Sequence, residues 1–356
     1  MFHEVLIAVM AGFAVLGALD RIFGNRFGIG QEFENGILAM GSLALAMVGI
    51  VSLAPVLAAV LRPVLEPVFA FLGADPAMFA GSILACDMGG GSLAVELAQS
   101  REAAMLGGVL TGSMLGATVV FTIPVAMGIL EEQDRENMAQ GMLCGIVTIP
   151  VGVFIGGIAA GYPIGMVARN LIPIVLLAAL IALGLWRAKT AMIRGFEVFG
   201  KGVVAVVTVG LAAAIVEALT GFAVIPGMAP ISEGFQTVGS IAIVLAGAFP
   251  LVKAVTKLLQ KPLTVLGAKI GINETAAAGL VATLANSIAT FGMVKDMDRR
   301  GKVVNIAFAV SAAFVFGDHL GYAAGFAPEM IGPMILGKLA AGVTAVAVAL
   351  FAVREK

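Results

Sequence analysis

Charged side chains are scarce in this sequence. Asp, Glu, Lys and Arg make up 12% of its 356 residues, about half of the roughly 25% usual in soluble proteins, and their net charge is −1. The chain has no basic run and no series of stacking aromatics, which argues against nucleic acid as a partner. Its two cysteines, Cys86 and Cys144, lie in apolar segments and provide neither a disulfide framework nor a CxxC metal site. The scarcity of charge excludes a large soluble domain.

Hydrophobic residues dominate instead. They account for 60% of the chain, and the mean hydropathy is +1.06. The 46 glycines and 14 prolines fit transmembrane helices, in which neighbouring helices or cavities satisfy the backbone groups that these residues free. The first apolar stretch, residues 5–19, lacks a basic n-region and a small-residue cleavage site, so we interpret it as a retained span rather than a signal peptide. The sequence predicts an all-α polytopic membrane protein.

A window of about 20 apolar residues per crossing predicts nine transmembrane helices. Two further apolar stretches, 77–97 and 274–294, are interrupted near their middles by polar or glycine-rich residues, and we interpret them as broken elements. The predicted spans are residues 4–20, 36–60, 103–128, 138–160, 170–186, 202–221, 237–257, 303–326 and 333–352.

The basic residues predict the orientation, because Lys and Arg collect in short cytoplasmic loops. The loop 187–201 carries four of them and the segment 221–236 none, which places the first inside and the second outside. Basic clusters flank 274–294 on both sides, and only a re-entrant hairpin, which enters and leaves by one face, allows this. Treating 77–97 in the same way places the N-terminus outside. The loop 131–136 is acidic and nevertheless falls on the cytoplasmic side.

The two halves of the chain resemble each other at an offset of 198 residues, which matches, for example, Gly73 with Gly271. Each half contains a span, a short proline-punctuated segment (61–72 or 259–270), a broken hairpin and a long span. Opposite orientations would make the halves an inverted repeat, a layout typical of secondary transporters; chance similarity in a glycine-rich chain is the alternative. The predicted units are a first repeat at 1–160 with a hairpin near 77–97, a linking helix and cytoplasmic loop at 161–201, and a second repeat at 202–356 with a hairpin near 274–294.

Asp87 occupies the tip of the first hairpin, where a charge at membrane depth costs roughly 2.5–3.5 kcal/mol on insertion scales. No Lys or Arg is near it in the sequence, so a protonated organic amine is a candidate partner that would keep it ionised. Gly89 and Gly90 permit close backbone approach at the same tip. The alternative is that Asp87 merely caps the half-helix that follows.

The second tip presents the neutral groups of Thr283, Asn286 and Ser287, which can donate to and accept from a hydroxyl. Their alternative role is to satisfy the broken backbone.

An acid and an imidazole, Asp318 and His319, lie side by side within the predicted span 303–326. Because His changes charge near neutral pH, the pair is a candidate proton-linked or gating element. The alternative is that Asp318 fixes its neighbours by hydrogen bonds to the second hairpin. Tyr322 offers a cation–π face, although an aromatic at such a position is also typical of packing.

Several of these motifs carry a resemblance to a known family: residues 84–90, 280–286, 293–298, 308–314 and 317–321. In this order they closely resemble the ethanolamine permease family, EutH, over nearly the whole chain. The resemblance implies a multi-pass protein of the bacterial inner (plasma) membrane that brings ethanolamine into bacteria that degrade it through a cobalamin-dependent lyase. The chain departs from the family's pattern at Gly91 and Ser92, where bulky aromatics are usual.

The leading hypothesis is therefore a permease that imports ethanolamine for ethanolamine utilisation. Asp87 would receive the ammonium, and Asn286 or Ser287 the hydroxyl. One alternative is a secondary transporter of another small polar solute or cation with a gate-type fold, like that of nucleoside carriers. Others are an intramembrane enzyme that uses Asp87 with Asp318 and His319, and a membrane anchor for other utilisation proteins.

The enzyme hypothesis lacks support because the sequence has no metal-ligand cluster and no nucleophile motif. No cofactor is expected, and the coupling ion, proton or sodium, stays open. The expected partners are ethanolamine and the lipid bilayer, without nucleic acid and with a homo-oligomer left open. The complete predicted site is Asp87, Gly89, Gly90, Thr283, Asn286, Ser287, Asp318, His319 and Tyr322.

Overall fold

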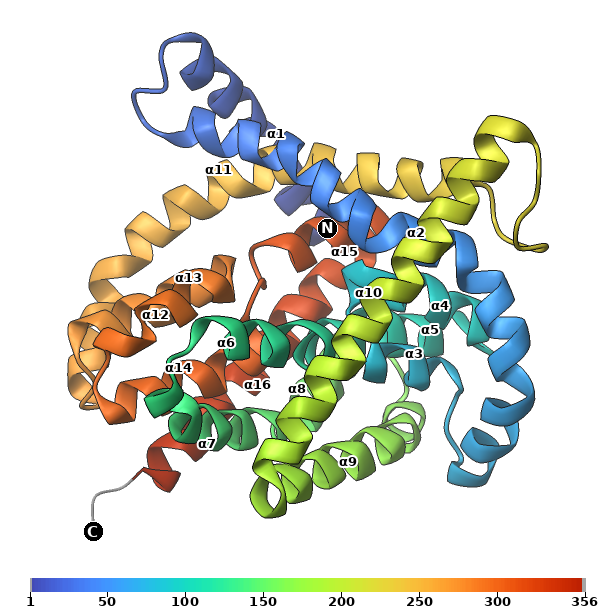
Figure 1. Ribbon diagram of the computed structural model, residues 1–356. Helices are drawn as coiled ribbons and strands as arrows, with labels where there is room; N and C mark the ends of the chain where they lie inside the picture. The colour runs from blue at the N-terminus through green and yellow to red at the C-terminus, as the bar shows by residue number, and fades with distance from the viewer. Residues whose placement is uncertain (1, 354–356) are drawn as a thin grey trace.

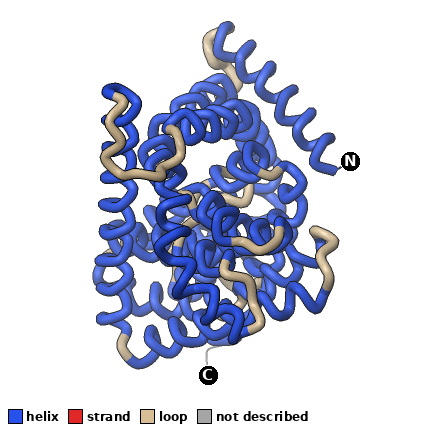
Figure 2. The backbone as a smooth tube through the Cα atoms, turned by 90° about the vertical axis from the view of Figure 1, so that its right-hand side faces the viewer, coloured by secondary structure: helices blue, strands red, loops and turns tan. Residues whose placement is uncertain are grey.

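A computed structural model describes residues 2–353, apart from the side chains of residues 2, 259–261, 263, 264, 266 and 268. Helices joined by loops and turns make up this part of the chain, and residues 2–353 contain no β-strand (Figures 1 and 2). The predicted all-α class is confirmed. The end of the predicted second repeat, 354–356, lies outside the described residues. The helices are α1 (Phe2–Ile22), α2 (Ile29–Leu72), α3 (Ala77–Ile83), α4 (Gly90–Leu97), α5 (Arg101–Met105), α6 (Ile123–Ile129), α7 (Arg135–Ile146), α8 (Ile149–Ala159), α9 (Ile164–Arg187), α10 (Lys189–Thr220), α11 (Ile231–Lys269), α12 (Glu274–Ala285), α13 (Ser287–Met293), α14 (Arg299–Ala312), α15 (Asp318–Phe326) and α16 (Ile331–Ala352).

Eight helical segments within residues 2–353 are long and apolar enough to cross a membrane. Each contains most or all of one of the predicted spans. The ninth predicted span, 303–326, is not one continuous helix, because α14 and α15 divide it, so the described residues contain eight continuous helices of spanning length where nine were predicted. The eight segments are His3–Ile22, Ile29–Leu72, Arg101–Ile129, Glu132–Ala159, Ile164–Arg187, Lys189–Thr220, Ile231–Leu258 and Pro328–Ala352.

An irregular break at residues 313–317 separates α14 from α15. Within it Phe314 has a φ of 62°, in the left-handed region that a bulky side chain rarely adopts. The break is held by the end of α12, since the N–H groups of Phe314 and Phe316 donate to the carbonyls of Thr283 (3.2 Å) and Leu284 (2.9 Å). These hydrogen bonds replace those that a continuous helix would have made, and α15 therefore begins inside the molecule.

The helices α2 and α11 are longer than a membrane crossing requires, with 44 and 39 residues. At 1.5 Å per residue α2 extends about 66 Å, roughly twice the thickness of the hydrocarbon core. The proline-punctuated segments predicted at 61–72 and 259–270 are the C-terminal parts of these helices rather than separate elements. Prolines inside both helices bend them, and Figure 1 shows the two helices curving around the molecule. The helices α2 and α11 pack against each other, and in Figure 1 their C-terminal parts diverge to opposite sides of the molecule.

Two pairs of short helices form the predicted broken elements: α3 with α4, and α12 with α13. The members of each pair pack against each other, and in Figure 1 the pairs lie on opposite sides of α15. Their surroundings match at the offset of 198 residues. Gly73 and Gly271, which follow α2 and α11, have φ values of 68° and 72°, and the side chains of Ser100 and Asp298 cap α5 and α14. The re-entry of these elements into the membrane and the inversion of the halves stay predictions.

Ion pairs between distant segments join parts of the chain that the charge pattern assigns to one face. Arg101 pairs with Glu329 at 2.6 Å, and both follow segments predicted to end outside. Lys253 pairs with Glu32 at 2.9 Å; Glu32 follows a span predicted to end inside, and Lys253 lies at the end of a span predicted to end inside. The contacts agree with the predicted orientation of the spans.

The acidic loop 131–136 has a partner of its own. Asp134 is 2% exposed, and its Oδ1 lies 2.6 Å from Nζ of Lys302, in the basic cluster after α13. The loop that conflicted with the charge pattern is therefore paired with a segment predicted to be cytoplasmic.

The wall behind the first broken element is a helix with wide, π-type turns at 106–116 and 118–122, within the span Arg101–Ile129. It packs closely against α3. A Cβ at Gly116 would collide with the carbonyl of Leu84, so glycine is needed for this approach. The close contact fixes the turn after α3 within the bundle.

Candidate functional site

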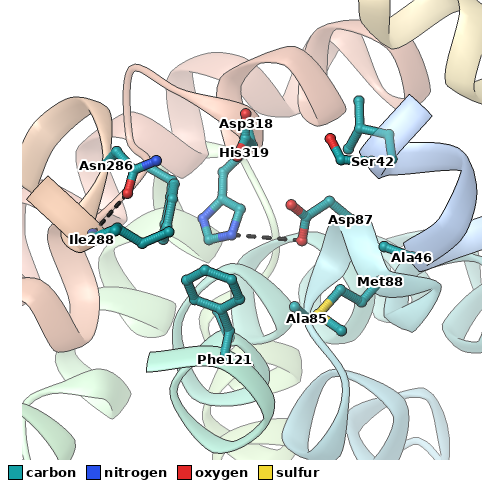
Figure 3. A pocket seen from close by; sticks show the side chains of 13 residues that line it. Ser42, Ala46, Ala85, Asp87, Met88, Phe121, Asn286, Ile288, Asp318 and His319 are labelled. Carbon is teal, nitrogen blue, oxygen red and sulfur yellow. Dashed lines mark hydrogen bonds and ion pairs between the residues drawn. The ribbon is translucent and has the colours of Figure 1, made fainter. Parts of the chain in front are cut away.

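The two broken elements, α2 and the start of α15 surround a cavity of about 330 Å³ (Figure 3). Four of the predicted site residues line it: Asp87, Asn286, Asp318 and His319. The other residues of its wall are Ser42, Leu43, Ala46, Ala85, Met88, Ala117, Phe121, Ile288 and Phe314. Residues that lie about 200 positions apart in the sequence thus share one chamber.

Asp87 lies in the single helical turn Cys86–Met88 that joins α3 to α4. No side chain caps the N-terminus of α4, so Asp87 does not have the capping role considered as its alternative. Its carboxylate instead lies toward His319, with Oδ1 3.7 Å from Nε2 (Figure 3). The side chain is 15% exposed and reaches the cavity.

The glycines after Asp87 shape its turn and do not line the cavity. Gly89 has a φ of 85°, and a Cβ there would also collide with Ile50 of α2. Gly90 donates its N–H to the carbonyl of Ala85 at 3.0 Å, which closes the turn, and a Cβ there would collide with the carbonyls of Leu84 and Ala85. Both positions therefore need glycine for backbone geometry rather than for contact with a ligand.

A buried lysine on α16 completes the polar network. Lys338 is 1% exposed; its Nζ lies 3.1 Å from Nδ1 of His319 and donates to the carbonyl of Ser113. A charged lysine can only donate, so Nδ1 accepts and a neutral His319 carries its hydrogen on Nε2, on the side of Asp87. The chain Lys338, His319, Asp87 therefore runs from the interior to the cavity.

Lys338 is absent from the site predicted from the sequence, and its presence corrects the expectation that Asp87 has no basic group in its surroundings. The signal was a lone lysine within the predicted span 333–352, since a charge inside an apolar span marks a functional position by default. Its partner Ser113 lies 225 residues away in the sequence, so the network itself could only be seen in the fold.

Asn286 is the extended residue between α12 and α13. Its Oδ1 accepts the N–H of Ile288 at 2.7 Å and caps α13, as its alternative role requires. This leaves the amide nitrogen Nδ2 as a donor, and Figure 3 shows it pointing away from Ile288. Asn286 thus satisfies the broken backbone and still offers a donor at the cavity wall.

The neighbours Thr283 and Ser287 are fully buried and do not line the cavity. The hydroxyls of Thr283 and Thr290 share a hydrogen bond of 2.7 Å, which joins α12 to α13. The hydroxyl of Ser287 has no hydrogen-bond partner among the described residues. Thr283 therefore holds the broken element together, and Ser287 lies behind the cavity wall.

Asp318 is the first residue of α15 and lies between two cavities. It lines the chamber of Asp87 and a second one of about 310 Å³, and Asn286 lines both. The ion pair of Glu32 and Lys253 belongs to the second wall. Among the described residues the Asp318 carboxylate has no ion pair and no side-chain hydrogen bond. The hydrogen bonds to the second broken element, considered as the alternative role of Asp318, are made instead by the backbone N–H groups of Phe314 and Phe316.

Aromatic rings form the apolar side of the first cavity. Phe121 and Phe314 meet edge to face with centroids 5.4 Å apart, and Phe314 lies 5.2 Å from the ring of His319. These rings provide a surface suited to the alkyl part or the cationic end of a small amine.

Tyr322, the aromatic predicted for the site, is fully buried away from this wall. It stacks on Phe326 at 4.9 Å, and a Cβ at Gly91 would collide with its hydroxyl. Tyr322 therefore fills the space beside Gly91, one of the two positions at which the chain departs from the pattern it resembles.

Cys86, Asp87 and His319 have potential metal-ligand atoms within 4.8 Å of one another, and they are the one group of this kind found among the described residues. The hydrogen-bond pattern does not favour a metal ion. With Nδ1 directed at Lys338 and the hydrogen on Nε2, a neutral His319 has no lone pair free for coordination.

Comparisons with known proteins identify the family of the chain. Residues 2–352 match the family described as "Ethanolamine utilisation protein, EutH". The chain is 58% identical over 349 residues to the "Probable ethanolamine permease EutH" of Listeria monocytogenes, which covers 98% of the chain and 94% of that protein. It is 49% identical over 389 residues to a Salmonella typhimurium protein of the same name, covering 99% and 95%. A Bacillus subtilis relative, "Uncharacterized protein YxeR", is 51% identical over 347 residues, covering 98% and 94%.

No solved structure matches the chain. Two of the three relatives are named as permeases, which are transporters rather than enzymes. The relatives and the eight apolar helices together identify a multi-pass bacterial membrane protein. The predicted family and membrane localisation are confirmed, and the chain belongs to the EutH family of ethanolamine utilisation proteins.

Proposed function

We propose that this protein imports ethanolamine, as the protonated amino alcohol, across the bacterial inner membrane. The observation that carries the proposal is Asp87, a carboxylate on the wall of a cavity among membrane-spanning helices, whose one described ion-pair contact is a histidine at 3.7 Å. This distance exceeds that of a normal hydrogen bond, so the carboxylate keeps room for a cation. The names of the relatives support ethanolamine as that cation.

The bound amino alcohol would lie between the two broken elements. Its ammonium donates to Asp87, and its hydroxyl accepts from Nδ2 of Asn286 on the opposite wall. The edges and faces of Phe121 and Phe314 cover the ligand between these ends. Asn286 is preferred to Ser287 because only Asn286 lines the cavity.

The route to the cytoplasm runs through the second cavity. Asp318 and Asn286 belong to both walls, so a cation that leaves Asp87 would meet a second carboxylate between the two cavities. The Glu32–Lys253 pair lies on the part of this route that the charge pattern assigns to the inside. Separation of the Glu32 and Lys253 side chains would release the ligand.

The proposed architecture is an inverted repeat of 1–160 and 202–356, joined by 161–201, in which α3–α4 and α12–α13 re-enter the membrane. The glycines that follow α2 and α11, and the side chains that cap α5 and α14, lie at matching positions 198 residues apart, which supports the repeat. The ion pairs that join segments assigned to one face support the orientation. We expect no cofactor, and a proton or a sodium ion is the candidate for coupling.

A transporter of another small organic cation is the second candidate. The cavity of about 330 Å³ favours it, because this volume exceeds what a molecule as small as ethanolamine fills.

Uptake of labelled ethanolamine by the purified protein in proteoliposomes tests the proposal. We expect saturable uptake that excess unlabelled ethanolamine abolishes, and imposed proton or sodium gradients will identify the coupling ion. Competition by a panel of larger amines separates the two candidates. Absence of ethanolamine uptake, with or without gradients, would reject the proposed function.

A further inference from the structure

The charges around the cavity do not cancel. Asp87 and Asp318 line it, and Lys338 lies behind it with His319 between. When a cation binds beside them the carboxylates are ionised, and two carboxylates against the one ammonium of Lys338 leave one negative charge for the ligand to balance. His319 counts as neutral, because protonation would put a second cation within about 3.1 Å of Lys338.

The other titratable groups near the site do not change this sum. Cys86 and Tyr322 are buried beside it and are uncharged as a thiol and a phenol. In the second cavity Glu32 and Lys253 form an ion pair at 2.9 Å and cancel. The excess of one negative charge therefore holds over both cavities.

We propose that Lys338 determines the charge selectivity of the site, by fixing its excess at one unit so that a substrate with a single positive charge is preferred. This inference rests on the proposed function and names its substrate class. An unbalanced charge among apolar helices is unfavourable. A monocation neutralises the site, an uncharged diol leaves the excess in place, and a diamine with two charges reverses its sign.

Lys338 lies where it can change the charge of the site without contacting the ligand. Its side chain is 1% exposed and does not line either cavity, so it does not touch the ligand. It acts through the field at Asp87 and through the orientation of His319. A change of ligand preference on replacement of Lys338 would therefore report charge rather than lost contact.

The test is calorimetric binding to the purified protein in detergent. The ligands are ethanolamine, propylamine as a monocation without the hydroxyl, ethylene glycol, and ethylenediamine, all titrated at one pH at which both amines of ethylenediamine are protonated. Lys338→Met keeps the length of the side chain and raises the excess to two charges. We expect the ratio of ethylenediamine to ethanolamine affinity to rise by about tenfold or more.

Asp318→Asn changes the sum in the opposite direction, to zero. It should weaken ethanolamine about tenfold and ethylenediamine further, and the double variant Lys338→Met/Asp318→Asn should recover the wild-type ratio. Lys338→Gln retains a donor for the Ser113 carbonyl and replaces Lys338→Met if the latter does not give a monodisperse, cooperatively melting protein. If neither folds, Asp318→Asn decides alone.

An unchanged affinity ratio in the folded Lys338 variant would overturn the inference, as would an unchanged ratio in Asp318→Asn if only that variant folds. The proposed function would stand as long as the wild-type protein binds ethanolamine. A wild-type protein that binds propylamine over ethylenediamine, and not ethanolamine, would instead reject the proposed substrate and keep the charge selectivity.

Discussion

Nε2 of His319 lies 3.7 Å from Oδ1 of Asp87. Hydrogen bonds of this type measure roughly 2.7–3.2 Å, so the imidazole faces the carboxylate without occupying it. On the far side of the ring Lys338 holds Nδ1 as an acceptor at 3.1 Å. The carboxylate thus keeps lone pairs for a cation, while the only ring nitrogen that faces it is oriented as a donor.

Replacing Asp87 by Asn tests the carboxylate directly. The change preserves the shape of the side chain and removes the charge that the ammonium needs. We expect the affinity for ethanolamine to fall by about 1.5–3 kcal/mol, the value of a charge-assisted hydrogen bond, or roughly 10- to 150-fold. Calorimetric titration of the purified variant measures the loss.

Ethylene glycol provides the matched control for Asp87→Asn, because its weak binding does not depend on a charge and should change little. The melting temperature should be unchanged or higher, since a buried charge is removed. Wild-type affinity for ethanolamine in a folded Asp87→Asn protein would move the ammonium site to Asp318.

Replacing His319 by Gln removes the imidazole between Asp87 and Lys338 and retains a donor. Because Lys338 lies 3.1 Å from Nδ1, the buried imidazole stays neutral near neutral pH. The uptake rate of His319→Gln should therefore follow the wild-type pH profile between about pH 5 and 8. The affinity at neutral pH should change less than about threefold, because the 3.7 Å contact is weak. A large loss of affinity would make His319 a direct ligand of the amine, and a flattened pH profile would show that its charge changes in this range.

Much of the membrane architecture could be predicted from the sequence because hydropathy and charge act locally. Asp87 was predictable for the same reason, as an acid at a glycine-rich interruption of an apolar stretch. The break at 313–317 was not, because it contains no proline and is held by carbonyls of Thr283 and Leu284, about 30 positions earlier. The Lys338 network likewise depends on helices that meet only in the fold.

More polar residues of the second tip were predicted for the site than line the cavity. Thr283, Asn286 and Ser287 have similar chemistry and are close in sequence, yet only Asn286 lies on the cavity wall. Their orientation depends on where α12 ends and how α13 turns away, which no periodicity in the sequence records.

The buried pair of Asp134 and Lys302 should contribute to stability. Their side chains are 2% and 13% exposed, and replacing Asp134 by Ala leaves the lysine without this partner. We expect the free energy of unfolding in detergent to fall by roughly 3 kcal/mol. Adding Lys302→Met should recover most of the loss, because the unpaired charge is then removed.

The exposed pair of Arg135 and Glu132 is the matched control for Asp134→Ala, with side chains that are 47% and 89% exposed in the same region. Replacing Glu132 by Ala should change the stability by less than about 1 kcal/mol. Equal effects of Glu132→Ala and Asp134→Ala would show that burial of the pair is unimportant.

The segments before and after the second broken element should face the same side of the membrane. Cys86 and Cys144 are buried, so the wild-type protein should react little with a membrane-impermeant thiol reagent. Single cysteines in place of the exposed Lys269 and Lys295 should both be labelled only when the reagent reaches the cytoplasmic face, as in inverted vesicles. A cysteine in place of Glu66, which is 47% exposed and predicted outside, is the control and should be labelled in intact cells. Labelling of positions 269 and 295 from opposite faces would mean that α12 and α13 cross the membrane, and the two halves could then not form the inverted repeat.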